Sequence, residues 1–150
     1  MRKIISLMFL MMFTVLANAQ INNPVTWSHT AVKVADKTYE LHLTASIESN
    51  WHMYAQDAGE GLAPTSIYFT PNPLISFNGK VKEVGKLQSS YEKYFKAVSK
   101  YYANKVAFVQ KIKVRSHVGT VVKGTVSYVV CNDRQCLPPK EVPFSIYIGG

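Results

Sequence analysis

Two cysteines, Cys131 and Cys136, are the residues whose type and spacing point most directly to chemistry. They lie in the stretch YVVCNDRQCLPPKEVPF with four residues between them, and the chain has no other cysteine. Such a pair can be a structural disulfide, part of a metal site or a redox dithiol. Strand-like runs before Cys131 and after Pro139 predict a hairpin end, so the two sulfurs are expected to lie close enough to bridge.

The metal interpretation is the weakest of the three. Structural zinc sites bring two closely spaced ligand pairs together, and this chain has a single cysteine pair. Haem-attachment, thioredoxin-like and nucleophile-elbow motifs are also missing from the sequence. We therefore expect no metal and no other cofactor. The histidines are all distant from the cysteines along the chain: His29, His42, His52 and His117.

The choice between a structural staple and a redox pair stays open on composition alone. Loop-closure entropy assigns a ring this short roughly 2 kcal/mol of stabilisation, against about 4–5 kcal/mol for a ring of about a hundred residues. A polar, exposed pair is also open to attack by thiols, which structural disulfides usually resist.

The first twenty residues predict export. A basic start precedes an apolar run over residues 4–16, which ends in the small-residue pattern Ala17-Asn18-Ala19. We expect residues 1–19 to be a Sec signal peptide cleaved before Gln20, and residues 20–150 to form one domain. The apolar run is short for a membrane span, so the mature protein is expected not to cross a membrane. Disulfides are the default state of cysteine pairs in exported proteins.

Alternation of apolar and polar residues predicts an all-β fold for the mature chain. From Tyr39 to Ile47, apolar residues occupy every second position, as in a strand with one buried face. Seven or more short strands separated by turn residues favour an antiparallel β-sandwich. Only Ser90 to Asn104 lacks clean alternation, and there we expect a long aromatic loop or a short helical turn. The other predicted strands span residues 26–34, 65–70, 81–87, 106–114, 122–130 and 142–148.

The formal net charge of +8 comes from scattered lysines, without a run of four. This pattern is typical of a solvated basic surface, and we expect no nucleic-acid partner. Aromatic residues gather in two stretches outside the clean alternation, residues 50–56 and 91–102. We expect Tyr101 and Tyr102 to belong to the core. His42 and His52 are expected to be surface or packing histidines.

The segment from Cys131 to Phe144 resembles the redox segment of the N-terminal domain family of the thiol:disulfide interchange protein DsbD. Three weaker similarities accompany it: Trp51-His52-Met53-Tyr54, Pro64-Thr65-Ser66-Ile67, and Tyr94-Phe95 upstream of Tyr102. The resemblance extends over residues 24–148. It implies an exported, immunoglobulin-like sandwich with a cap loop near residues 90–104.

The resemblance also implies thiol:disulfide exchange, in which electrons pass through Cys131 and Cys136 to or from partner redox proteins. Cys136 would form the mixed disulfide with the partner, and Cys131 would resolve it. Phe95 would be the aromatic cap over the pair, with Tyr94 as the second candidate.

Further roles follow from the same resemblance. Trp51, His52 and Tyr54 would form the wall of the active site. Near the sulfurs, Asp133 would oppose thiolate formation and Arg134 would favour it. Partners would be exported thioredoxin-like or disulfide-isomerase proteins and a membrane electron donor acting in trans, in the periplasm or another exported location. The alternative is a non-catalytic immunoglobulin-like binding module that keeps the pair as a structural disulfide and binds through its aromatic residues.

Overall fold

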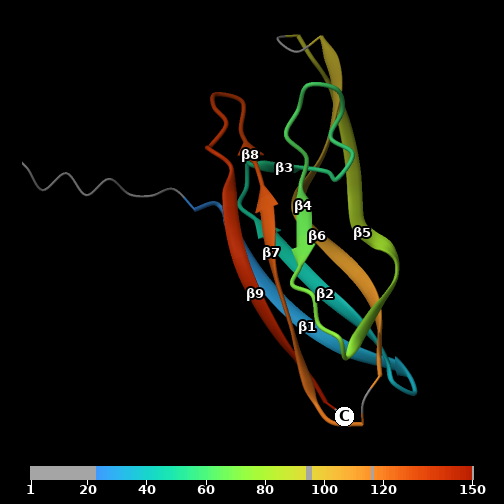
Figure 1. The fold of residues 1–150 in the computed structure, drawn as a ribbon. Coiled ribbons are helices and arrows are strands. Elements are labelled where there is room, and N and C mark those ends of the chain that lie inside the picture. The colour runs from blue at the N-terminus through green and yellow to red at the C-terminus, as the bar shows by residue number, and fades with distance from the viewer. Residues whose placement is uncertain (1–22, 94–95, 116, 150) are drawn as a thin grey trace, which may run out of the picture.

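The computed structural model describes residues 23–93, 96–115 and 117–149, which form nine β-strands and no helix (Figure 1). This confirms the all-β prediction. The predicted signal peptide lies outside the described residues. Within the described part, no helix is long and apolar enough to cross a membrane. The strands are β1 (Val25–Ala35), β2 (Thr38–Ile47), β3 (His52–Tyr54), β4 (Ser66–Phe69), β5 (Ile75–Glu92), β6 (Ala97–Val114), β7 (Thr120–Tyr128), β8 (Val130–Cys131) and β9 (Lys140–Ile148).

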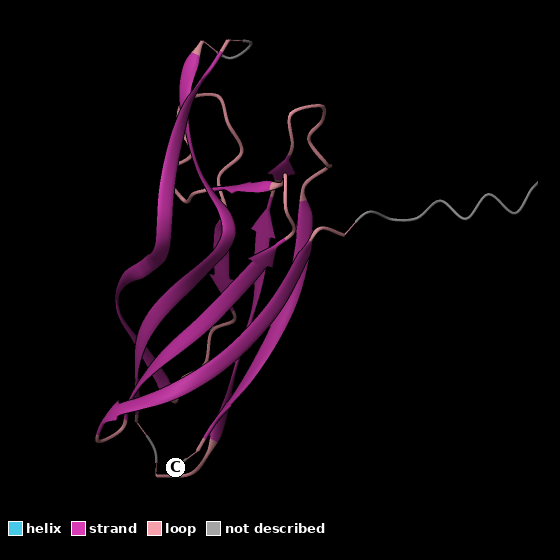
Figure 2. Cartoon of the chain, turned by 180° about the vertical axis from the view of Figure 1, so that it is seen from behind, coloured by secondary structure: helices cyan, strands magenta, loops and turns pink. Residues whose placement is uncertain are grey.

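The strands form two antiparallel sheets that pack as a sandwich (Figures 1 and 2). The first sheet has the order β1-β2-β6-β3-β8, and β5 also pairs with β6. The second has the order β4-β7-β9. β6 organises the first sheet, because it pairs with β5 along one edge while β2 and β3 follow one another along its other edge.

The core lies between the sheets and is built from alternate residues of the long strands. In β2, Leu41 and Leu43 are buried while His42 between them is partly exposed. β6 contributes Phe108, which is fully buried, and β7 and β9 contribute Val122 and Ile146 to the same core. Alternation in the sequence therefore reports which face of each strand loses contact with water.

The segment expected to be a loop or a helical turn is mostly strand. β5 continues to Glu92 and β6 begins at Ala97, so only the connection between them remains outside regular structure. The alternation is weak here because burial does not follow residue type: Tyr91 and Val98 are exposed, whereas Ser99 is buried. Tyr102 is buried in the main core, whereas Tyr101 is half-buried against a separate small cluster. Tyr102 is thus the core residue that was predicted, whereas Tyr101 is only partly buried and packs against the smaller core cluster.

One end of the sandwich collects the elements that surround the cysteines. β3, β8 and the far ends of β5 and β6 lie together there in both views, above the main body of the two sheets (Figures 1 and 2). The connection from β3 to β4 reaches the same end, where it is hydrogen-bonded to β6.

Candidate redox site

Cys131 and Cys136 form a disulfide at the end of a hairpin, as their flanking sequence predicts. They face one another as an isolated antiparallel pair, with Cα atoms 4.0 Å apart. Leu137 donates a backbone hydrogen bond to Val130, and Asn132 donates one to Gln135, each of 2.9 Å. The cysteines lie between these bonded positions, where opposed strands approach most closely and where a disulfide fits directly across the hairpin.

The two sulfur-bearing residues differ sharply in their access to solvent. Cys131 is 2% exposed, while Cys136 is an exposed residue. Cys131 is covered because it belongs to β8, which pairs with β3, and because it packs in a small cluster with Tyr54, Ala58 and Val129. Among the residues that the structure describes, Cys136 has no such cover, since it lies just after the connecting loop. An incoming thiol or disulfide therefore reaches the Cys136 side of the bond first.

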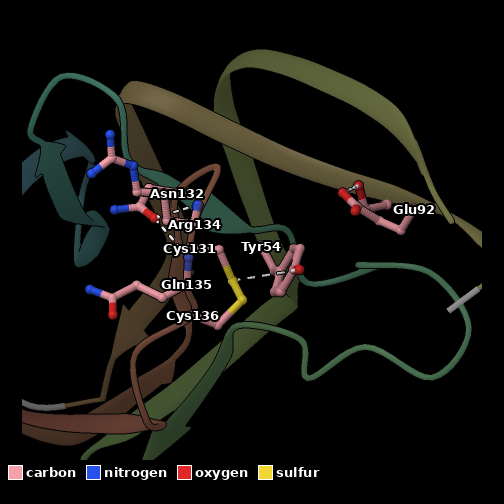
Figure 3. The surroundings of a disulfide bond; sticks show 8 residues. Tyr54, Glu92, Cys131, Asn132, Arg134, Gln135 and Cys136 are labelled. Atoms are coloured by element: carbon pink, nitrogen blue, oxygen red, sulfur yellow. Dashed lines mark hydrogen bonds between the residues drawn. A yellow bond between two sulfur atoms is a disulfide. The ribbon is translucent and has the colours of Figure 1, made fainter. Parts of the chain in front are cut away.

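The loop between the cysteines is held in shape by Asn132. Its side-chain oxygen accepts hydrogen bonds from the backbone N–H groups of Arg134 and Gln135, both at 2.9 Å (Figure 3). This is an Asx turn, which asparagine favours because its short amide side chain can replace a backbone acceptor. The turn fixes the position of Cys136 relative to Cys131 while leaving the loop side chains in solvent.

The disulfide opens onto a hollow of about 390 Å³. β3 supplies His52 and Tyr54 to its lining, and the hairpin loop supplies Asp133 and Arg134 along with both cysteines. Four of the residues predicted from sequence to surround the cysteines are thus brought together around them. The remaining lining comes from Ser90, Glu92, Tyr101, Asn132 and Gln135.

Tyr54 points its hydroxyl at the disulfide (Figure 3). The oxygen lies 3.6 Å from Cys131 Sγ, and because a disulfide sulfur carries no proton, the hydroxyl is the donor. Burial, reinforced by the negative charge of Glu92, raises the pKa of Tyr54. The hydroxyl therefore keeps its proton at neutral pH and remains a donor to sulfur.

His52 lies directly opposite Cys131 in the β3–β8 register. Its ring is 4.6 Å from the ring of Tyr101 and 5.9 Å from that of Tyr54, between centroids. Burial lowers the pKa of His52, although the nearby carboxylates of Glu92 and Asp133 act in the opposite direction. The imidazole is therefore mainly neutral at neutral pH.

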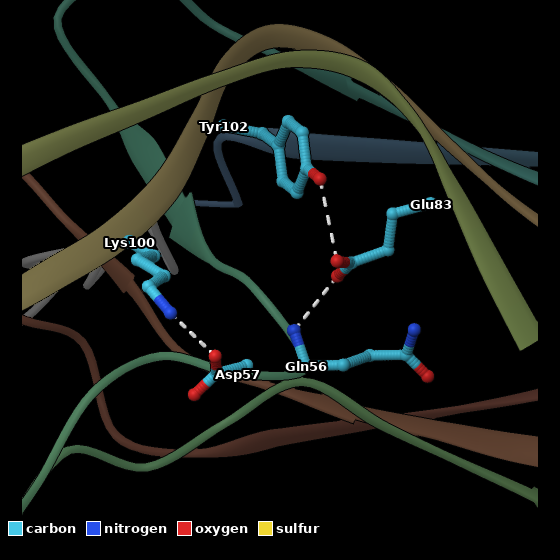
Figure 4. A network of polar contacts seen from close by, with 5 residues as sticks. All are labelled: Gln56, Asp57, Glu83, Lys100 and Tyr102. Atoms are coloured by element: carbon cyan, nitrogen blue, oxygen red, sulfur yellow. Dashed lines mark hydrogen bonds and ion pairs between the residues drawn. The ribbon is translucent and has the colours of Figure 1, made fainter.

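A polar network fixes the connection from β3 to β4 against the β5–β6 hairpin (Figure 4). One oxygen of Glu83 accepts the backbone N–H of Gln56 at 2.7 Å, and the other accepts the hydroxyl of Tyr102 at 3.3 Å. Lys100 forms an ion pair with Asp57 at 2.5 Å between Nζ and Oδ2. Burial and then the charge of Glu83 raise the pKa of Tyr102 to about 12. These contacts hold the strands that carry Tyr54 and Tyr101 in place.

Not every predicted site residue lines the hollow. Trp51 is 8% exposed and belongs to the main core. It also borders a second, polar hollow of about 380 Å³ with Ser49, Asn50 and the residues from Asn132 to Arg134, which does not include the cysteines. The predicted cap residues Tyr94 and Phe95 lie outside the described residues.

Sequence reasoning missed Glu92 and Tyr101 as parts of this site. The parity of β6 offered a signal for Tyr101, because a neighbour of the core residue Tyr102 must face the other side of the strand. In the structure Tyr101 pairs with Tyr54 across β3 and β6. Glu92 had no comparable local signal, since its approach to the cysteines depends on the length of the β5–β6 hairpin. Among the described residues, no cluster of histidine, cysteine or carboxylate side chains is arranged to hold a metal ion.

Comparison with known protein families matches this chain to one of them. The family model described as thiol:disulfide interchange protein DsbD, N-terminal, matches residues 23–146. Among curated proteins, no sequence matches the chain significantly.

Solved structures share the fold at low sequence identity. The N-terminal periplasmic domain of ScsB from Proteus mirabilis superposes with a TM-score of 0.58 at 18% identity, over 85% of this chain and 47% of that chain. This chain thus spans about half of the ScsB chain. The reduced N-terminal domain of DsbD from Neisseria meningitidis gives a TM-score of 0.55 at 18% identity, over 85% and 87% of the two chains. A complex of the DsbD and PilB N-terminal domains from N. meningitidis gives 0.52 at 16% identity, over 84% and 87%.

Proposed function

Because the chain belongs to the family of the N-terminal domain of the thiol:disulfide interchange protein DsbD, we propose that it is an exported thiol:disulfide exchange domain. It carries electrons through Cys131 and Cys136 to or from partner redox proteins. The observation that carries this proposal is the asymmetry of the disulfide, in which Cys136 is exposed beside an open hollow and Cys131 is buried behind it. A purely structural bridge has no need of an accessible sulfur.

The asymmetry supports a separate role for each cysteine. In the reduced protein, the Cys136 thiolate attacks a disulfide of the partner, forms a mixed disulfide and releases the first partner thiolate. Cys131 then attacks the Cys136 sulfur, re-forms the intramolecular disulfide and releases the second partner thiolate. Two electrons pass to the partner, and the same steps in reverse reduce this protein.

Tyr54, His52, Asp133 and Arg134 are the proposed surroundings of the reacting sulfurs, because they line the same hollow. Phe95, with Tyr94 as the second candidate, remains the proposed cap on the basis of the family resemblance. Trp51 is proposed to act as a packing residue for the hairpin loop, since it lies in the core beside that loop.

The proposed partners are thioredoxin-like or disulfide-isomerase proteins outside the cytoplasm, together with a membrane electron donor in trans. Support for a protein partner comes from the solved complex between the DsbD and PilB N-terminal domains of N. meningitidis. The ScsB domain of similar fold is periplasmic. That location, together with the signal-like pattern over residues 1–19, supports a periplasmic or otherwise exported setting for this chain.

The reduction potential of the Cys131–Cys136 pair tests the proposal. The mature protein is equilibrated in graded thiol–disulfide buffers and quenched with an alkylating mass tag, and its free thiols are counted. We expect a midpoint between about −180 and −270 mV, the range of exchange proteins. A midpoint below about −300 mV identifies a structural disulfide and leaves the non-catalytic binding module as the function. A variant with both cysteines replaced by serine shows the background of the tag.

A further inference from the structure

We infer that His52 is the acid–base partner of Cys131, taking the proton of the resolving thiol and returning it to the thiolate that leaves. This inference rests on the proposed exchange function and adds a residue to its chemistry. It also replaces the expectation from sequence that His52 is only a packing or surface histidine.

The register of the first sheet carries the inference. His52 of β3 lies directly opposite Cys131 of β8. Opposed residues of an antiparallel pair project to the same face, with Cβ atoms about 4.5–5.5 Å apart. Both side chains line the hollow onto which the disulfide opens. The imidazole is therefore a neighbour of the buried sulfur, on the side from which a partner approaches.

The setting of the ring keeps it available for proton transfer. Tyr101 packs against the ring at 4.6 Å between centroids, and Tyr54 meets its edge at 5.9 Å. These contacts hold the ring in place without using its nitrogens. Within the described part of the chain, no hydrogen bond to either imidazole nitrogen of His52 is present. His52 is half-buried and lines the hollow.

The charges around the ring suit a base that becomes cationic for a short time. Glu92 reaches the site from β5 and Asp133 from the hairpin loop, and both favour the imidazolium. Arg134, from the same loop, is the cation that lines the hollow. The hollow is also lined by the phenol groups of Tyr54 and Tyr101. Burial outweighs the carboxylates and lowers the pKa of His52, so that the resting state is the neutral base.

The proton balance of the resolving step is simple. In the mixed disulfide, the Cys131 thiol gives its proton to His52, which leaves a thiolate beside an imidazolium. The thiolate attacks Cys136 Sγ, the bond between Cys136 and the partner breaks, and the partner sulfur leaves with the electron pair. The imidazolium then protonates that thiolate or the surrounding water, and His52 is neutral again. The hydroxyl of Tyr54, which already points at Cys131 Sγ, stabilises the same thiolate.

The test isolates the resolving step. Reduced protein is mixed in a stopped-flow instrument with dithiobis(nitrobenzoate), an aromatic disulfide that releases a coloured thiolate. Attack by Cys136 releases one equivalent in a phase that depends on reagent concentration. Attack by Cys131 releases the second equivalent in a phase whose rate does not depend on reagent concentration. The rate of this second phase is measured from about pH 5 to about pH 10, a range that spans the ordinary pKa values of histidine and cysteine.

Wild-type protein and two variants are compared. His52→Gln removes the base, whereas His42→Gln is the matched control, because His42 lies on β2 and is absent from the lining of the hollow. We expect His52→Gln to slow the second phase at least about tenfold at pH 7, with the difference closing above about pH 9, where the thiol ionises without help. The first phase and the His42→Gln variant should be unchanged.

Two results overturn the inference. One is a His52→Gln variant whose second phase keeps the rate and pH profile of the wild type. The other needs no variant: a wild-type second phase that shows no inflection in the histidine range and follows thiol ionisation alone. The measured reduction potential decides the exchange function separately, so a failure of His52 and a failure of the proposed function are distinguishable.

Discussion

At the scale of single residues, the site is defined by unequal exposure of chemically identical groups. Cys131 and Cys136 are linked to one another, yet only Cys136 is exposed. The difference arises because Cys131 pairs with His52 in the sheet, while Cys136 follows a four-residue loop. Exposure controls which sulfur a bulky disulfide can approach, and it is the basis for the proposed order of the two exchange steps.

This asymmetry makes a direct prediction about single-cysteine variants. Reduced Cys131→Ser should form a long-lived adduct with glutathione disulfide through Cys136, because no second thiol is present to resolve it. Cys136→Ser should form its adduct at least about tenfold more slowly, since Cys131 is buried. Mass spectrometry after an acid quench measures both rates. Faster reaction of the Cys136→Ser variant would reverse the assigned roles.

Tyr102 predicts a pH dependence of stability. Its folded pKa is raised to about 12 from an ordinary value of 10.0 by burial and by Glu83. The neutral phenol is therefore favoured by folding. Its contribution is fully present below about pH 10 and is lost as the pH rises toward 12.

Urea unfolding at about pH 8 and about pH 11 measures this loss. Between these values, wild type should lose more free energy of unfolding than Tyr102→Phe, by at most about 1.4 kcal/mol. Tyr147→Phe is the control, because Tyr147 is 69% exposed. Equal losses in wild type and Tyr102→Phe would show that the phenol of Tyr102 ionises as it does in the unfolded chain.

At the scale of elements, the site depends on how the connection from β3 to β4 is attached to β6. Ala55 donates a backbone hydrogen bond to Lys100 at 2.9 Å, and Lys100 donates one to Ala58 at 2.8 Å. Gly59 then passes so close to Val98 that a Cβ placed on it would lie 2.2 Å from the carbonyl oxygen. The glycine is needed both for this approach and for its φ of 111°.

Replacement of Gly59 by alanine should therefore destabilise the fold by more than about 2 kcal/mol, because backbone atoms must shift. Gly61→Ala is the matched control. Gly61 also has a positive φ, of 75°, but a Cβ there meets nothing within 4 Å, so its cost should stay near 1 kcal/mol. Thermal or urea unfolding compares the two. Equal costs would mean that the connection moves away from β6 without penalty.

At the scale of the whole molecule, the main hydrophobic core and the candidate redox site occupy different regions. The main core lies between the two sheets and includes Leu41, Phe108 and Val122. Cys131 belongs to a separate small cluster at the end of the sandwich. A domain of this size buries enough apolar surface to fold without a disulfide.

Reduction should accordingly leave the sandwich folded. The expected decrease in the free energy of unfolding is about 2 kcal/mol or less, the amount that closure of so short a ring contributes. Circular dichroism and urea unfolding, with and without reductant, measure it. The variant with both cysteines replaced by serine should match the reduced wild type and should not respond to reductant. Unfolding on reduction would favour the structural role of the disulfide.

The sequence by itself determined the features that depend on neighbours along the chain. Alternation from Tyr39 to Ile47 predicted a strand because one face had to be buried, and turn residues between two strand-like runs predicted that Cys131 and Cys136 could bridge. The family resemblance was likewise available from the cysteine segment. Alternation also did not predict the burial of Gln110, a polar residue whose amide donates to the carbonyl of Asn78 at an irregularity of β5.

Only the tertiary structure decided which residues surround the sulfurs. His52 and Tyr54 come from β3, Glu92 from β5 and Tyr101 from β6, and these strands meet the cysteine hairpin through pairing between segments far apart in the chain. No local pattern records such pairing, since hydrogen bonds between strands involve the backbone and are the same for most residue types. The burial of Cys131 has the same origin, because it depends on the strand beside it rather than on its own sequence.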